Sequence, residues 1–231
     1  MKHNVLLKRL LHALPVILTA VFFMVSSVHG AVTVSGDVDP DDPNTWWALT
    51  SATIGDTGAG TLAITKGDSI SIADAIIGYG AGSIGTVNLD GEGSEWINSR
   101  GLRIGNMGEG HLSITNGGSV TNTSGGLGCF EDSCGIVNVD GKGSAWTNSD
   151  SLSLGNYGTG KLSITNGGLV INSQGSVGSS PSGNGTVTVD GEGSAWETYD
   201  NLYVGGSGKG TLSVTNGGSV INSNGYIARY S

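Results

Sequence analysis

Hydrophobic and polar residues alternate along the chain in short runs separated by glycines. The runs KLSIT (161–165), LVINS (169–173) and TVTVD (186–190) place an apolar side chain at every second position. Alternation over four or five residues indicates a strand with one buried face, and no long stretch after residue 30 has helical spacing. The pattern therefore predicts an all-β protein.

These runs repeat with a constant period. GHLSITNGGSV begins at residue 110 and has counterparts at 60, 160 and 210, whereas GIVNVDGKGSAW begins at 135 and has counterparts at 85 and 185. The unit is about 25 residues long in two alternating versions, which together make a 50-residue double repeat. Three short strands per unit of fixed length predict a parallel β-helix, and the chirality of parallel crossovers predicts right-handed coiling. We expect residues 31–231 to form one domain of about seven coils and an incomplete last coil.

The first thirty residues have a different character. Lys2, Lys8 and Arg9 precede a short apolar run over residues 14–25, and small residues follow before Ala31. This order is typical of a secretory signal peptide, with an uncleaved anchor as the alternative. The sequence thus predicts an exported protein, located outside the cell, on the outer surface or in the periplasm.

Charge narrows the choice of partners. The formal net charge is −9, and residues 1–30 carry three basic residues and no acidic ones, so the remainder has seven basic and nineteen acidic residues and a charge of −12. Such a surface repels nucleic acid and anionic lipid. We therefore expect no nucleic-acid partner, and an extracellular glycan or a cell surface remains as a candidate.

Two rows of residues recur at the same position of each unit. Tryptophans alternate with Ile70, Val120, Val170 and Val220, which suggests a core ladder in which large and small side chains take turns; the alternative is an outward row that stacks on sugars. Two positions further on, asparagines recur, with Thr198 as the one substitution, and we expect them to hydrogen-bond from coil to coil. The two rows are Trp46, Trp96, Trp146 and Trp196, and Asn98, Asn122, Asn148, Asn172 and Asn222.

Asp90, Asp140 and Asp190 form a third row, each before a glycine. Glycoside hydrolysis uses paired carboxylates, but these aspartates lie two coils apart and stand where turn aspartates are expected. Calcium-binding nonapeptide repeats require a nine-residue period, which is absent from this sequence. The sequence therefore predicts no catalytic, cofactor-binding or metal-binding residues, and no cofactor.

The segment GCFEDSCG (128–135) departs from the repeat. Cys129 and Cys134 are the only cysteines of the chain, and in an exported protein they are expected to form a local disulfide. Phe130, Glu131 and Asp132 between them are the best candidates for a recognition loop. Simple loop variation and a weak metal site are the alternatives.

The two ends of the repeat array differ. Prolines and acids in SGDVDPDDPNTWW (35–47) are expected to cover the lower edge of the stack. Tyr226, Ile227 and Tyr230 end on a coil whose strand edges are open to pairing. This predicts end-to-end self-association through the C-terminal coil, or a shortened relative of a longer protein.

The alternation GTVTVDGEGSAW (185–196) and GTLSVTNGGSV (210–220) resembles the repeat associated with autotransporter passengers (type V secretion) and PEP-CTERM proteins of Gram-negative bacteria. The resemblance covers the chain from Ala31 onward and implies a β-helical stalk of a secreted or surface protein, without catalytic residues. The expected function is a non-catalytic structural or adhesive module. The alternative is a polysaccharide-active or carbohydrate-binding β-helix protein.

Overall fold

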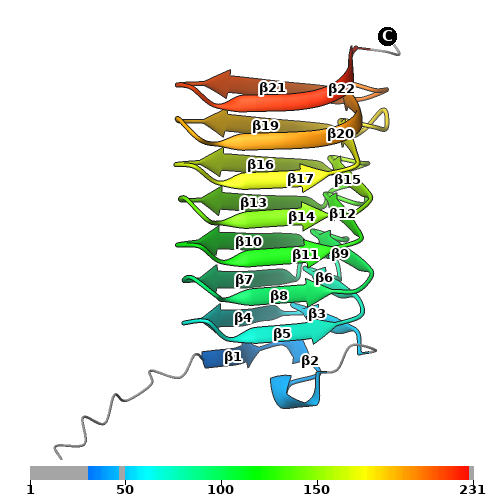
Figure 1. The fold of residues 1–231 in the computed structure, drawn as a ribbon. Helices are drawn as coiled ribbons and strands as arrows, with labels where there is room; N and C mark the ends of the chain where they lie inside the picture. The colour runs from blue at the N-terminus through cyan, green and yellow to red at the C-terminus, as the bar shows by residue number, and fades with distance from the viewer. Residues whose placement is uncertain (1–30, 47–49, 229–231) are drawn as a thin grey trace, which may run out of the picture.

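The computed structural model describes residues 31–46 and 50–228, which form a parallel β-solenoid of about seven turns (Figure 1). The predicted signal peptide at residues 1–30 lies outside the described residues. Within those described, no helix has both the length and the apolar character needed to cross a bilayer.

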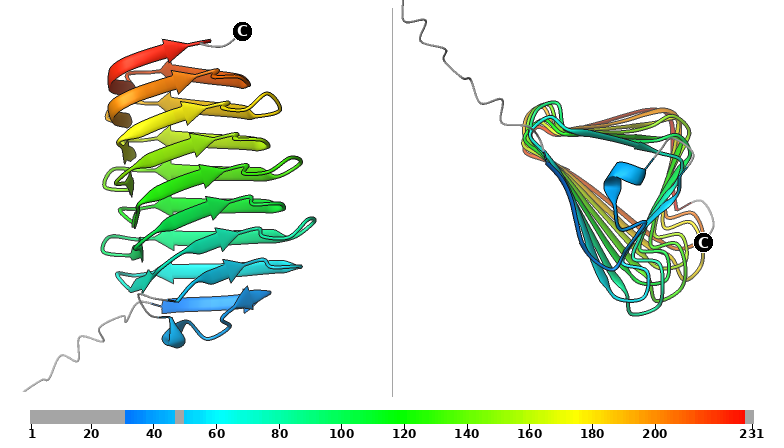
Figure 2. Two further views of the ribbon diagram at one scale, coloured as in Figure 1. Left: turned by 90° about the vertical axis from the view of Figure 1, so that its right-hand side faces the viewer. Right: turned by 90° about the horizontal axis from the view of Figure 1, so that it is seen from below.

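Each coil has three sides, and equivalent strands of successive coils lie side by side. Seen along the axis, the stack has a triangular outline (Figure 2). The first side is an eight-stranded sheet of β1 (Ala31–Gly36), β4 (Ala59–Thr65), β7 (Ile84–Asp90), β10 (Glu109–Thr115), β13 (Cys134–Asp140), β16 (Thr159–Thr165), β19 (Asn184–Asp190) and β21 (Lys209–Thr215).

The second and third sides join into one sheet, because two long strands near the C-terminal end run around the corner between them. These two strands are β20 (Ala195–Val204) and β22 (Ser219–Ile227). The remaining strands of the second side are β5 (Ser69–Ile72), β8 (Glu95–Asn98), β11 (Ser119–Asn122), β14 (Ala145–Asn148) and β17 (Leu169–Asn172). Those of the third side are β3 (Ala52–Ile54), β6 (Ala75–Ile77), β9 (Gly101–Ile104), β12 (Ser124–Leu127), β15 (Ser151–Leu154) and β18 (Gln174–Val177).

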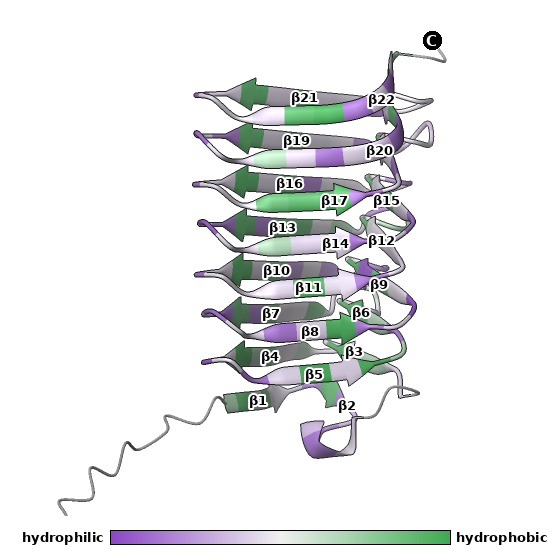
Figure 3. Ribbon diagram, viewed as in Figure 1, coloured by the Kyte–Doolittle hydropathy of each residue, from purple (hydrophilic) through white to green (hydrophobic). Residues whose placement is uncertain are grey.

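The register confirms the 25-residue period. Leu112 of β10 pairs with Val137 of β13, and the same step of 25 residues relates every neighbouring pair on the first side from β4 to β21. Every second residue of each strand points inward, and apolar side chains therefore stack in columns along the axis. In Figure 3 a hydrophobic band lies just before the end of the first-side strands in coil after coil.

The predicted tryptophan row is confirmed as a core ladder for three of its four members. Trp96, Trp146 and Trp196 have no exposed surface. On the second side they alternate with smaller residues in the order Ile70, Trp96, Val120, Trp146, Val170, Trp196, Val220. The alternative of an outward, sugar-stacking row is wrong.

Space for the rings comes from glycines of the neighbouring coil. A Cβ on Gly125 would lie 2.8 Å from Cζ2 of Trp146, and a Cβ on Gly175 would lie 3.0 Å from Cζ2 of Trp196. Leu152 fills the same third-side position in the tryptophan-containing coil and pairs with both glycines. From Trp96 onward, one coil version therefore carries Trp and Leu and the next carries Val and Gly, so the 50-residue repeat is a packing period.

Trp46 departs from the prediction. It is buried, but it follows the short 3-10 helix η1 (Pro43–Thr45) and is not part of a strand beneath Ile70. Its Nε1 donates to the carbonyl oxygen of Pro40 at 3.0 Å. The reason is that residues around η1 fold across the end of the core, as the view from below shows (Figure 2).

The first predicted coil is likewise a cap. β1 pairs antiparallel with β4, and β2 (Val38–Asp39) pairs antiparallel with β3. The expectation that this segment covers the lower edge of the stack is confirmed. At the other end, Ile221 is 58% exposed and Ile227 is 84% exposed on β22. End-to-end association through this coil stays a prediction, and Tyr230 lies outside the described residues.

Candidate functional site

The asparagine row is part of the interior. Asn98, Asn122, Asn148 and Asn172 are buried, whereas Asn222 in the last coil is partly exposed. The expected bond between coils exists from Asn122 Nδ2 to Asn148 Oδ1, at 2.6 Å. In place of a further Asn–Asn bond, Asn172 Nδ2 donates to Thr198 Oγ1 at 3.3 Å.

Two of the five asparagines, Asn122 and Asn172, also accept hydrogen bonds from tryptophans. Trp146 Nε1 donates to Asn122 Oδ1 at 2.7 Å, and Trp196 Nε1 donates to Asn172 Oδ1 at 2.6 Å, each time one coil below. Trp96 has Ile72 at the equivalent position, so its buried Nε1 has no partner. Asn122 and Asn172 therefore satisfy buried indole groups, and the buried asparagines of the row are interior residues of the stack.

The aspartate row binds neighbouring coils together. Oδ1 of Asp140 accepts from Thr165 Oγ1 and Asn166 Nδ2, both at 2.6 Å and both in the next coil. Asp90 and Asp190 likewise each accept from a threonine and an asparagine of the next coil. The predicted role in a turn is supported by these contacts, which occupy the carboxylates at the corner of the stack.

The serine of the DGEGS and DGKGS segments connects to the coil below, whereas the aspartate connects to the coil above. Ser144 Oγ donates to the carbonyl of Asp140 at 2.7 Å and accepts from the N–H of Gly117, one coil below, at 3.1 Å. Ser94 and Ser194 repeat both bonds. These turns lie at the first corner, between the first and second sides. One such turn in each double repeat is thus tied to the coil above by an aspartate and to the coil below by a serine.

The third corner, between the third and first sides, differs because its turns vary in length. Six residues connect β12 to β13, but only four connect β15 to β16. Long and short turns alternate. The other two corners compensate together: in the coil with the long turn they have three residues and one residue, and in the coil with the short turn they have four and two, so that both coils keep the same length. Side chains on short turns therefore lie between projecting loops.

Residues 128–133 form the central long loop. Ser133 is buried, its Oγ donates to the carbonyl of Phe130 at 2.7 Å, and the N–H of Phe130 donates back to that Oγ at 3.2 Å. Asp132 has φ of 60°, a left-handed conformation that aspartate tolerates better than most residues. The predicted recognition residues Phe130, Glu131 and Asp132 are all exposed on this fixed loop.

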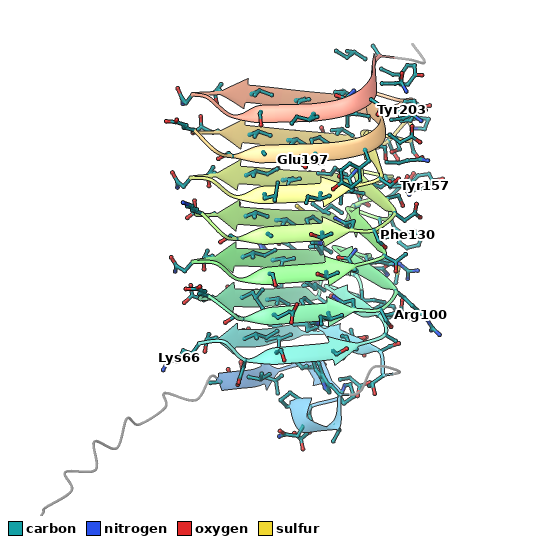
Figure 4. All side chains as sticks on the ribbon, in the orientation of Figure 1. Lys66, Arg100, Phe130, Tyr157, Glu197 and Tyr203 are labelled. Atoms are coloured by element: carbon teal, nitrogen blue, oxygen red, sulfur yellow. The ribbon has the colours of Figure 1, made fainter. Side chains whose placement is uncertain are left out.

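A shallow hollow of about 590 Å³ lies beside the loop. We call the six residues that line it the loop face: Ala81, Met107, Phe130, Glu131, Asp132 and Tyr157. Backbone bonds from Met107 to Tyr79 and from Phe130 to Asn106 show that these turns stack in consecutive coils. Phe130 and Tyr157 project from the same side of the stack (Figure 4).

A second hollow of about 440 Å³ shares Glu131, Asp132 and Tyr157 with the loop face and continues past them to Thr159 and Ser182. The acidic loop tip therefore stands between two depressions of the surface.

The predicted disulfide between Cys129 and Cys134 is not formed in this structure, in which both thiols are free. The thiols lie on different sides of the corner: Cys129 Sγ lies beside Gly126 on the third side, and Cys134 begins β13 next to Glu109 on the first. Burial raises the pKa of the Cys129 thiol to about 11, and the nearby Arg103 guanidinium offsets this only in part. Burial, and secondarily Glu109, also raises the pKa of Cys134, so both remain protonated at neutral pH.

Met107 and Tyr157 are loop-face residues that the sequence reasoning missed. They are 41% and 46% exposed, while Phe130 is 52% exposed. The signal was present, because Met107 and Tyr157 are 50 residues apart at one position of the repeat and flank the loop of Phe130 by one coil on each side.

In the part of the chain that the structure describes, no three His, Cys, Asp or Glu side chains gather closely enough to hold a metal ion. No protein-family model, curated protein or solved structure matches the chain.

Proposed function

We propose that the protein is an exported, non-catalytic β-solenoid that acts as a structural and adhesive module at the cell surface, with the loop face as its contact surface. The observation that carries this proposal is the exposure of Met107, Phe130 and Tyr157 in three consecutive coils around one hollow. Apolar side chains gathered in this way on a polar protein are typical of a binding site.

The remaining recurrent residues support a structural role for the rest of the stack. The tryptophans, asparagines and aspartates each contact the neighbouring coil, through packing or hydrogen bonds. The repeat's resemblance to autotransporter-associated repeats and the leader-like residues 1–30 support export.

Carbohydrate binding at the same face is the second candidate. It is favoured by two exposed rings, Phe130 and Tyr157, next to the carboxylates of Glu131 and Asp132, because sugars stack on rings and donate hydroxyls to carboxylates.

The first test is where the protein resides. Intact mass should be measured separately on protein from the periplasm, the outer surface and the medium. We expect a species that begins near Ala31 on the surface or in the medium. A protein found only inside the cell, or one that retains Met1, would contradict export.

The second test addresses adhesion. Beads coated with the purified protein should attach to whole bacterial cells, and attachment should be lost in the double variant Phe130→Ser, Tyr157→Ser. Tyr199→Ser is the matched control, because Tyr199 is 66% exposed and lies outside the loop face. Equal attachment of the double variant and the control would refute the loop face as the contact surface.

A further inference from the structure

The loop face combines apolar walls with negative charge. Met107, Phe130 and Tyr157 come from coils about 4.8 Å apart, and Glu131 and Asp132 lie at the exposed loop tip between the two hollows. None of the residues that line either hollow is basic. The surface thus presents rings, a thioether and two carboxylates, and neither carboxylate forms an ion pair with a residue that the structure describes.

This set of groups suits an organic cation. An aromatic ring attracts a cation to its face, and a guanidinium group stacks on rings while donating hydrogen bonds to carboxylates. A neutral sugar would use the rings and leave both carboxylate charges uncompensated, and an anionic ligand would be repelled. The net charge of −12 for residues 31–231 adds long-range attraction for a basic partner.

The loop is also shaped in advance. The two bonds between Ser133 and the backbone of Phe130 fix the loop in the conformation that lines both hollows. A partner would therefore not have to order this segment on binding, which lowers the entropic cost of association.

From these observations we infer that the loop face binds arginine or lysine side chains of an extended basic segment in a partner protein. The two hollows share Glu131, Asp132 and Tyr157, so alternate residues of one extended segment can each place a side chain on either side of the acidic tip. This inference rests on the proposed role of the loop face as a contact surface and specifies what that surface contacts.

The test uses a fluorescent peptide, Gly-Ser-Arg-Ser-Arg-Ser-Gly, and the same peptide with citrulline in place of both arginines. Citrulline keeps the shape of arginine without its charge. Fluorescence anisotropy should show binding of the arginine peptide and binding about tenfold weaker, or none, of the citrulline peptide. Cellohexaose should not compete with the arginine peptide.

Variants distinguish binding at the loop face from general attraction by the negative charge of the protein. Phe130→Ala and Tyr157→Ala should each weaken binding of the arginine peptide about fivefold. The double variant Glu131→Gln, Asp132→Asn should weaken it similarly and reduce its dependence on salt. Tyr199→Ala, which leaves the loop face intact, should bind as the unmodified protein does.

Equal binding of the two peptides, unchanged binding by Phe130→Ala, or competition by cellohexaose would overturn the inference. The adhesion test reports separately on the proposed function. If Phe130→Ser with Tyr157→Ser abolishes bead attachment while the arginine peptide fails to bind, then the contact surface is correct and the ligand class is wrong.

Discussion

At the scale of single residues, a buried indole group distinguishes otherwise equivalent coils. Trp96 and Trp146 occupy the same position with no exposed surface, but only Trp146 has a partner for its Nε1, the Oδ1 of Asn122. Ile72 replaces the asparagine beneath Trp96. The same substitution should therefore have different costs at the two sites.

We predict that Trp146→Phe destabilises the protein by about 1–2 kcal/mol more than Trp96→Phe. Both changes remove the same ring volume, but the first also leaves Asn122 Oδ1 without its donor. Chemical denaturation of the two variants measures the difference in the free energy of unfolding. Equal losses would mean that the Trp146–Asn122 bond contributes nothing.

Gly125 gives a second prediction at this scale. Gly125→Ala places a Cβ 2.5 Å from Asn148 Oδ1 and 2.8 Å from the Trp146 ring, so it should cost about 1–3 kcal/mol through overpacking. Gly225→Ala is the matched control, because its nearest neighbour is the amide of Asn222 at 3.2 Å in the uncovered last coil. A thermal melt should show a large shift for the first variant only; similar shifts would argue against close contact with the ring.

At the scale of elements, the turns that end the first-side strands connect the coils. Hydrogen bonds from Thr115 and Asn116 hold the pKa of Asp90 below its ordinary value of 3.8. Thr215 and Asn216 lower the pKa of Asp190 in the same way. Since these pKa values are lower in the folded than in the unfolded chain, the ionised carboxylates stabilise the fold fully above pH 3.8.

This stabilisation should be lost as the pH falls through the folded pKa values. We predict that the melting temperature of the unmodified protein falls more steeply between about pH 5 and about pH 2 than that of the double variant Asp90→Asn, Asp190→Asn. Asp41→Asn, at an exposed position in the cap, should follow the unmodified protein. Parallel curves for all three proteins would exclude a contribution of these carboxylates.

The sequence predicted elements well where they repeat and poorly where they do not. The step of 25 residues, the alternation of Trp96 with Val120 and the turn position of Asp140 all follow from comparing one unit with the next. The antiparallel pairing of β1 with β4 has no counterpart elsewhere in the chain, so no internal comparison predicted it. The placement of Trp46 in the cap was missed for the same reason.

The loop at residues 128–135 shows a second limit of prediction from the sequence. Two cysteines in one short loop suggested a disulfide, but the corner turns Cys129 and Cys134 toward different sides of the stack. The closeness of the two cysteines in the sequence therefore did not determine the directions of their side chains. Comparison of the repeats, in contrast, would have placed Met107 and Tyr157 on either side of Phe130.

At the scale of the whole molecule, the double repeat links the core to the surface. The coil version that contains tryptophan has a four-residue third-corner turn, and the other version has six residues there. The alternation of the two coil versions, which packs the interior, thus also spaces the projecting loops and leaves the hollows between them. The tryptophans are used for packing, and the contact surface that we propose therefore consists of other residues, those of the loop face.

The inward direction of the tryptophans is the central claim, and their fluorescence tests it most directly. The measurement is the emission maximum and acrylamide quenching of the native protein in a Trp47→Phe background, which leaves Trp46, Trp96, Trp146 and Trp196. We predict blue-shifted emission that acrylamide quenches only after unfolding. Red-shifted emission that acrylamide quenches equally in the native and unfolded protein would place the rings in solvent and contradict both the packing period and the assignment of binding to the loop face.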